Sequence, residues 1–421
     1  MRVLGIGARV DLGSLYLALL REGHEVRVHA DDPAFATVFD GLVDKVADWR
    51  AELAWVGRDG LVLFEKVGRG AVQDALRRDG YRVIGGSALG DRLEYDRGFG
   101  QETLRGAGLR TAPAYEFSDA AAAAAWLREH PGRTVLKHFN NARATFVGAH
   151  AAGLDVLYQL ARAPAGPVLL MPVIAGIEVG VGAYFDGARF LEPACIDFEH
   201  KRFFPGEIGE MTGEMGTLVS YRGAGPIMRA TLGRVAPTLA AGGHVGYVNL
   251  NMIANAEGLW PLEFTCRFGN PGFAILSPLQ EAGWGDLFGR MLGGTQASFP
   301  TAGGWCVGVV LTVPPFPEER PGCDGTVDPP VFFHVPPDDA GHFHYSDMRR
   351  GADGQLHAGR GTGYAMVVTG VGGTIPDAKA AALGRAHQVC IPDLRFRSDI
   401  GDRVEQGEAA ALRAMGWLDD T

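Results

Sequence analysis

The segment PLEFTCRFGNP, residues 261–271, holds the most informative run of charged and turn-forming residues in the sequence. It follows a stretch with strand character at 247–253 and a short polar turn, so the pattern predicts a β-hairpin. On such a hairpin we expect Asn251 and Glu263 to point into one cleft. A carboxylate there suits Mg²⁺, which prefers oxygen ligands, and Arg267 could stabilise charge that develops during phosphoryl transfer. The spacing alone also fits a surface hairpin whose Glu263 and Arg267 are only solvated.

The composition is that of a globular chain with several domains. Its 421 residues suit two to four domains, and 47% hydrophobic with 21% charged residues allow a substantial core. A net charge of −10 argues against nucleic acid as a partner. No apolar run reaches membrane-spanning length, which argues against a membrane partner. The five cysteines form no CxxC pair, and no leader precedes the first strand, so we expect a cytoplasmic protein with reduced thiols.

Strands and helices alternate in the first hundred residues. Strand patterns at 2–6, 25–30, 61–65 and 81–84 are separated by helical patterns that include 12–22 and 71–78. Such alternation predicts a parallel sheet with crossover helices. We therefore expect an amino-terminal α/β domain over residues 1–100.

The alternation is less regular after residue 100. Helices are expected at 91–107 and 120–129, the second with Ser118 and Asp119 as cap candidates, and strands at 135–137, 168–171, 177–184 and 246–253. From Trp305 the pattern changes to strands at 307–313, 331–335 and 364–368 and a helix at 375–387. These patterns predict a central domain over 101–304 and a small mixed α/β domain over 305–421.

The EFTCRFGNP run resembles the EFNxRFGDPE signature of the phosphoribosylamine–glycine ligases, also called glycinamide ribonucleotide synthetases. Other segments agree with this family in collinear order: GGS at 85–87 with LEYD at 93–96, AGIE at 175–178, HKR at 200–202, TGEMG at 212–216, and FRSDIG at 396–401. The resemblance implies the ATP-grasp fold, in the α/β and α+β class. It adds an amino-terminal Rossmann-like (pre-ATP-grasp) domain, a mobile lobe at about 115–180 and a carboxy-terminal lid domain.

The resemblance also implies a role for each matching residue. Lys137 would contact phosphate, and Met171 to Ile174, including Val173, would form the adenine hinge through backbone groups. Glu178 would hold the ribose hydroxyls, and Lys201 would lie near the γ-phosphate. Glu263, with Asn251 and Thr265, would bind the metal, and Arg267 would meet developing charge. The implied cofactors are ATP and Mg²⁺ (or Mn²⁺).

The activity that the resemblance implies is ATP-dependent ligation. A carboxylate attacks the γ-phosphate to form an acyl phosphate, and an amine then displaces phosphate to form an amide. Positioning and charge neutralisation would supply most of the rate. The partners would be a small-molecule carboxylate and a small-molecule amine, and the protein would be a monomer or a homodimer.

Several motif positions depart from this family. The phosphate loop at 138–145, HFNNARAT, has neither glycine nor lysine, which leaves Arg143 as its cation. Thr265 replaces the usual metal-binding Asn, and Asn251 stands where many relatives have an acid. Asn270 replaces the acidic residue of the family's RFGDP sequence, and Glu214 replaces the middle glycine of the family's TGGMG motif. These departures predict a diverged paralogue with a different carboxylate, a different amine, or both.

Two other functions stay open at this point. The chain could be a true phosphoribosylamine–glycine ligase that tolerates the altered motifs, or an inactive ATP-grasp protein that binds nucleotide as a sensor. Arg9, near a helix amino terminus, could hold an anion or simply be exposed. His342 and His344 alternate as strand neighbours and could bind a metal or form one face of a hairpin.

Overall fold

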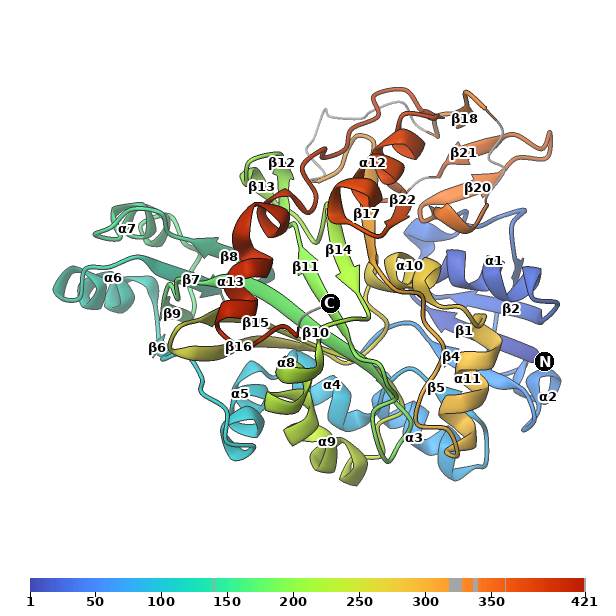
Figure 1. Cartoon of the computed structure of the whole chain (residues 1–421), viewed down its shortest axis with the longest axis horizontal. Coiled ribbons are helices and arrows are strands. Elements are labelled where there is room, and N and C mark those ends of the chain that lie inside the picture. The colour runs from blue at the N-terminus through green and yellow to red at the C-terminus, as the bar shows by residue number, and fades with distance from the viewer. Residues whose placement is uncertain (139–140, 318–327, 336–339, 360, 420–421) are drawn as a thin grey trace. The chain divides into compact units, whose positions relative to one another are not determined.

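The structure is a computed structural model that describes residues 1–138, 141–317, 328–335, 340–359 and 361–419 (Figure 1); for residues 138 and 141–144 it describes the backbone alone. The described residues form two compact units. The first contains Met1–Thr103, Glu178–Asn251 and Glu263–Thr421, and the second contains Leu104–Ile177 and Met252–Leu262. No helix among the described residues is long and apolar enough to cross a membrane.

The amino-terminal part of the first unit is a five-stranded parallel sheet in the order β3-β2-β1-β4-β5. The strands are β1 (Arg2–Gly7), β2 (Glu25–Ala30), β3 (Asp44–Lys45), β4 (Leu61–Phe64) and β5 (Val83–Ile84). Helices α1 (Gly13–Arg21), α2 (Leu53–Val56) and α3 (Gly70–Arg78) connect them. Residues of β4 are buried on both faces, as a parallel sheet covered by helices requires. The predicted alternation of strands and helices is confirmed.

A buried carboxyl group lies at the end of this sheet. Glu65 follows β4 with 1% exposure, accepts a hydrogen bond from the Tyr16 hydroxyl at 2.8 Å and accepts another from the Asp11 backbone N–H at 3.0 Å. Burial, helped by the charge of Asp11, raises the pKa of Glu65 from 4.5 to about 8. The folded chain therefore keeps a proton that the unfolded chain loses, so stability should fall as pH rises from about 4.5 to about 8.

We expect Glu65→Gln to weaken this pH dependence because its amide cannot ionise. Urea unfolding of both proteins at a series of pH values between 5 and 9 measures the effect. The stability of the variant relative to the natural chain should rise steadily with pH until about 8, which is the pKa of Glu65 in the folded chain. Parallel curves for the two proteins would contradict the prediction.

The larger sheet of the first unit has eight strands in the order β16-β15-β10-β11-β14-β17-β22-β19. Their bounds are β10 (Ile177–Phe185), β11 (Cys195–Glu199), β14 (Gly216–Ser220), β15 (Gly246–Asn255), β16 (Gly258–Thr265), β17 (Trp305–Thr312), β19 (Phe343–Tyr345) and β22 (Tyr364–Gly372). The far ends of β15 and β16 belong to the second unit. Since β14 pairs with β17, strands from before and after residue 305 share one sheet (Figure 1).

Helix α12 (Ile375–Ala386) packs against β17 and β22. Glycine is needed at this contact because a Cβ atom at Gly370 would overlap with the backbone nitrogen of Ala382. We expect Gly370→Ala to destabilise the fold by about 1–3 kcal/mol through overpacking. Gly384→Ala is the matched control, since a Cβ atom there meets nothing within 4 Å and alanine favours a helix by about 1 kcal/mol. Opposite signs in urea unfolding are the expected result, and equal losses would contradict it.

The remaining described elements of the first unit are short. They are helices α4 (Ala88–Tyr95), α8 (Gly225–Ala230), α9 (Leu232–Ala241), α10 (Gly272–Leu276), α11 (Trp284–Gly293) and α13 (Ala409–Ala414), the strand pairs β12 (Arg202–Phe204) with β13 (Ile208–Met211), β18 (Phe332–Phe333) with β23 (Val389–Cys390) and β20 (Met348–Arg350) with β21 (Leu356–Ala358), the 3₁₀ turns η1 (Pro33–Phe35), η2 (Ser277–Leu279) and η3 (Ala340–His342), and η4 (Val404–Glu408). The strand expected at 331–335 is therefore only two residues long.

The single helix expected at 91–107 is wrong. The structure has two helices, α4 and α5 (Arg97–Gly106), with Asp96 between them in a non-helical conformation. The Asp96 side chain accepts a hydrogen bond from the Phe99 backbone N–H at 3.0 Å. A short carboxylate competes with the helical backbone in this way and favours a new amino terminus over a continuous helix.

The second unit has its own antiparallel sheet and core. Its strand order is β6 (Tyr115–Phe117), β9 (Val168–Pro172), β7 (Thr134–His138) and β8 (Asn141–Val147), with helices α6 (Ala120–Glu129) and α7 (Leu154–Leu160). Leu127, Leu136 and Leu170 are among its buried core residues. The Asp119 carboxylate accepts from the Ala122 backbone N–H at 2.8 Å, so Asp119 is the cap of α6 as the sequence predicts.

Candidate active site

One face of the eight-stranded sheet carries a row of polar side chains. Successive side chains of a strand point to opposite faces, so every second residue shares a face. A cavity of about 220 Å³ opens over this face. Its walls come from residues that alternate along β11, β14, β15 and β16 and from the loops that follow: Cys195, Asp197, Glu199, Lys201, Gly213, Glu214, Thr217, Val219, Tyr247, Asn249, Glu263, Thr265, Arg267, Gly269, Asn270, Gly272 and Leu276.

Two glycines of β10 make room beneath this polar face. A Cβ atom at Gly180 would overlap with the Asp197 carboxylate, and one at Gly182 would overlap with the Tyr247 hydroxyl. In register, Gly180 lies opposite Asp197 in the neighbouring strand. The absence of a side chain at these two positions of β10 therefore lets buried polar groups of β11 and β15 pack across the strand.

Lys201 is the charged centre of the cavity. Its Nζ lies 2.9 Å from Glu178 Oε1, 3.0 Å from Glu199 Oε2 and 3.9 Å from Glu263 Oε1. Burial acts to lower the pKa of Lys201, but the carboxylates of Glu199, Glu178 and Glu263 hold it well above the ordinary value. The amine therefore stays protonated, and it brings together side chains that are far apart in the sequence.

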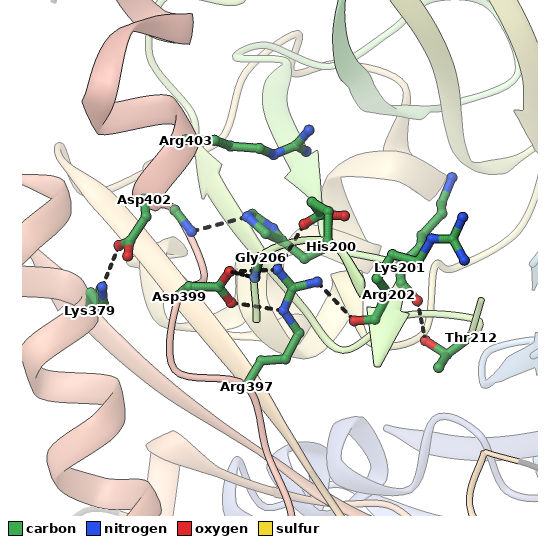
Figure 2. Close-up of polar contacts among 12 residues, drawn as sticks. His200, Lys201, Arg202, Gly206, Thr212, Lys379, Arg397, Asp399, Asp402 and Arg403 are labelled. Carbon is green, nitrogen blue, oxygen red and sulfur yellow. Dashed lines mark hydrogen bonds and ion pairs between the residues drawn. The ribbon is translucent and has the colours of Figure 1, made fainter. Parts of the chain in front are cut away.

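The chain on both sides of Lys201 is held by hydrogen bonds (Figure 2). The Lys201 carbonyl accepts from the Thr212 hydroxyl at 2.7 Å and from the Thr212 backbone N–H at 2.8 Å. The His200 Nε2 atom accepts from the Gly401 backbone N–H at 3.3 Å, which leaves Nδ1 to donate to the Phe198 carbonyl at 3.1 Å. Burial, together with nearby arginines, lowers the pKa of His200 to about 3, so this ring is neutral.

A buried arginine from the carboxy-terminal segment supports the same strand. Arg397 has 0% side-chain exposure and donates to the Arg202 carbonyl at 2.8 Å. It also pairs with Asp399 at 2.8 Å and with Glu207 at 2.7 Å. Figure 2 shows Arg397 between Asp399 and the backbone of Arg202. The FRSDIG segment thus stabilises the strand that follows Lys201.

Arg267 reaches the cavity from the loop after β16. Its Nε lies 3.3 Å from Glu94 Oε1, and Glu94 also accepts from the Cys266 backbone N–H at 2.7 Å. The side chain of Arg267 is 30% exposed. Glu94 of α4 therefore orients a cation that lines the same cavity as Lys201.

The structure brings the three predicted metal ligands to one region of the sheet. Glu263 and Thr265 line the cavity, and the Asn251 side-chain N–H donates to Glu178 Oε1 at 2.8 Å. Glu263 is 52% exposed and also pairs with Arg97 at 3.1 Å. Within the described ranges, no group of three or more His, Cys, Asp or Glu side chains could hold a metal ion. The oxygens of Glu263 and Thr265 suit a hard cation such as Mg²⁺, and the ligand set stays a prediction.

Comparison with known proteins gives consistent relatives. No family model matches the chain. The phosphoribosylamine–glycine ligase of Corynebacterium ammoniagenes is 26% identical over 412 residues, which cover 90% of this chain and 89% of the relative. The phosphoribosylamine–glycine ligase of Mycobacterium tuberculosis is 27% identical over an alignment of 446 positions, which covers 97% of this chain and 99% of the relative.

Solved structures agree with the sequence relatives. Phosphoribosylamine–glycine ligase from Thermotoga maritima superposes with a TM-score of 0.72 at 18% identity, covering 95% of this chain and 100% of that one. The chain is a relative of the phosphoribosylamine–glycine ligases and has the ATP-grasp fold. The biotin carboxylase domain of Hydrogenobacter thermophilus 2-oxoglutarate carboxylase, solved with MgADP, has the same fold at a TM-score of 0.63 and 11% identity, covering 96% and 98%.

The other nucleotide-binding residues predicted for this ATP-grasp chain lie in the second unit. Lys137 is in β7, and Met171 is near the end of β9. Val173 and Ile174 follow β9, and the Val173 backbone N–H donates to the Arg133 carbonyl at 3.0 Å. The side chain of Arg143 and all of residues 139–140 lie outside the described part of the chain. The roles of these residues stay predictions.

The sequence interpretation missed several polar residues of the cavity: Asp197, Glu199, Tyr247 and Asn249. A signal was present, because CIDFE at 195–199 and YVNLN at 247–251 alternate polar with apolar residues. Such alternation is typical of a strand with one polar face. Alternation alone does not distinguish a solvated face from a functional site.

Two weaker candidates lie outside this cavity. Arg9 stacks over the Phe35 ring at 4.3 Å and lines a second cavity of about 160 Å³, and its predicted anion contact stays a prediction. The rings of His342 and His344 lie 2.9 Å and 3.2 Å from the Thr369 hydroxyl. Both rings thus lie within hydrogen-bond distance of the same threonine hydroxyl, which explains their positions without a metal ion.

Proposed function

We propose that this chain is an ATP-dependent ligase that joins a carboxylate to an amine through an acyl phosphate. The observation that carries the proposal is the cavity in which Lys201, paired with Glu178, Glu199 and Glu263, faces the same space as Arg267. Two fixed cations beside oxygen ligands suit the transfer of a charged phosphoryl group. The relatedness to phosphoribosylamine–glycine ligases supports the same reaction class.

In the proposed reaction, a carboxylate oxygen of one substrate attacks the γ-phosphorus of ATP, the bond to the β–γ bridging oxygen breaks, and ADP leaves. The amine nitrogen then attacks the acyl carbon, inorganic phosphate leaves, and the nitrogen loses a proton as the amide forms. Lys201 and Arg267 bind and orient the negative groups. Glu263 and Thr265 would hold Mg²⁺ or Mn²⁺, which supplies neutralisation of phosphate charge.

We also propose that the substrates differ from glycine and phosphoribosylamine. Three substituted positions support this proposal, because all of them line the cavity: Glu214, Thr265 and Asn270. Each stands where the family motif has a different residue. A changed wall alters which groups find a partner, and a substrate group left without its partner binds much more weakly.

ADP release with Mg²⁺ tests both statements. Glycine with freshly generated phosphoribosylamine is compared with a panel of amino acids and amines, and the products are identified by mass. Amide formation with another pair supports the altered specificity. Turnover with glycine and phosphoribosylamine alone would overturn the altered specificity. The same holds if expression of this chain restores growth without purines to a strain that lacks its own phosphoribosylamine–glycine ligase. Bound ATP without any turnover would favour the inactive sensor.

A further inference from the structure

The loop before β14 places a buried glutamate in the wall of the cavity. Glu214 is 8% exposed and lines the cavity. Its Oε1 atom accepts no hydrogen bond from any described residue, and the same holds for the hydroxyl of Thr217, which is 2% exposed. Buried polar groups are nearly always paired in a folded protein. Two unpaired oxygens in one wall therefore indicate a ligand group that is able to donate hydrogen bonds.

The charge around Glu214 favours a positive ligand. Asp197 and Glu199 belong to the same cavity wall, and Lys201 already pairs with Glu199 at 3.0 Å. Asp197 is 6% exposed and accepts a hydrogen bond from the Asn249 amide at 2.6 Å. Three carboxyl groups thus line the same wall. The charges of Lys201 and Arg267 act on Glu214, but no described residue donates a hydrogen bond to its Oε1 atom, and burying such a group is costly until a partner arrives.

The pKa values of Glu214 and Asp197 are both raised, as expected for buried carboxyl groups that lie near one another. Burial, followed by the charges of Glu199 and Asp197, raises the pKa of Glu214 well above its ordinary value. Burial and the charge of Glu199 raise the pKa of Asp197 to about 7. A bound cation would lower both values, since an opposite charge stabilises the carboxylate.

We infer that the cavity recognises a substrate that carries a positively charged nitrogen, with Glu214 as the residue that contacts it and Asp197 as a second carboxylate nearby. This inference rests on the proposed ligase function and names the chemistry of one substrate. The selected class carries this charge in addition to its reacting groups, as in the side-chain ammonium of a basic amino acid or the second amine of a diamine. The family motif has a glycine residue in place of Glu214, and a glycine residue has no side chain that could make this contact.

Binding of small probes tests the inference without any turnover. The probes are n-butylammonium, n-butyrate and 1-butanol, which have similar chains and differ in head-group charge. Calorimetry is performed at neutral pH on the natural chain, Glu214→Gln and Glu214→Gly. Glu65→Gln is the matched control, because it replaces another buried carboxyl group, 1% exposed against 8% for Glu214, that does not line the cavity. Circular dichroism and thermal melting check that each variant folds.

The expected result is selective binding of n-butylammonium that weakens about ten-fold or more in both Glu214 variants and is unchanged in Glu65→Gln. Tighter binding of n-butyrate, or equal ammonium binding by all four proteins, would overturn the inference. Lack of ADP release with any substrate pair would instead count against the proposed function, so the two failures are distinguishable. In the turnover assay, L-ornithine should be preferred over L-norleucine, which has a side chain of similar shape that ends in a neutral methyl group.

Discussion

Lys201→Met is expected to lower ATP-dependent turnover by about 100- to 1,000-fold, the usual effect of removing one group that stabilises transition-state charge. The substitution removes the cation that lies 2.9 Å from Glu178 and 3.0 Å from Glu199. The carboxylates left behind would then repel the phosphates of ATP. The decrease should therefore be present both in kcat and in kcat/KM for ATP, measured by ADP release with a substrate pair identified in the panel.

Two further variants sharpen this experiment. Lys45→Met removes a lysine of similar side-chain exposure, 21% against 24% for Lys201, from the edge of the amino-terminal sheet, and it should leave turnover unchanged. Glu263→Gln keeps the shape of the proposed metal ligand and removes its charge, so it should raise the Mg²⁺ concentration needed for half-maximal rate. Turnover by Lys201→Met at the natural rate would exclude the proposed role of Lys201.

Arg397→Met is expected to lower the free energy of unfolding by about 2–4 kcal/mol, because it removes a buried guanidinium and its charge-assisted hydrogen bonds to Asp399, Glu207 and the Arg202 carbonyl. The guanidinium has 0% exposure, and its removal leaves the Asp399 carboxylate, 23% exposed, without its cation. The Arg202 carbonyl loses a hydrogen bond of 2.8 Å as well. Urea unfolding followed by circular dichroism measures the loss.

Arg395→Met provides the comparison for Arg397. Arg395 is two residues earlier and donates to the Phe316 carbonyl at 2.9 Å, so its loss should cost about 1 kcal/mol, as for one ordinary hydrogen bond. Arg397→Lys should restore little of the stability, because an ammonium group cannot reproduce the planar fork of donors. Equal losses in Arg395→Met and Arg397→Met would show that the buried ion pairs contribute nothing specific.

Turn and strand patterns were reliable where local sequence decides the structure. The alternation over residues 1–84 predicted the parallel sheet, since buried strands and amphipathic helices have different periods. The helical pattern expected over residues 91–107 failed at Asp96, where one side chain divides the stretch into two helices. A single local hydrogen bond there outweighs the periodicity that surrounds it.

The sequence by itself determined the fold class, because the collinear motifs and the hydrophobic periodicity are both local properties. It also identified Lys201, Glu178, Glu263 and Arg267 as candidates by their place in those motifs. Only the tertiary structure brought Asp197, Asn249 and Glu214 to the same cavity, since the order of strands in a sheet depends on hydrogen bonds between distant segments. Only the tertiary structure showed that Glu214 is buried without a partner, because burial and pairing are properties of the folded surroundings and not of the residue.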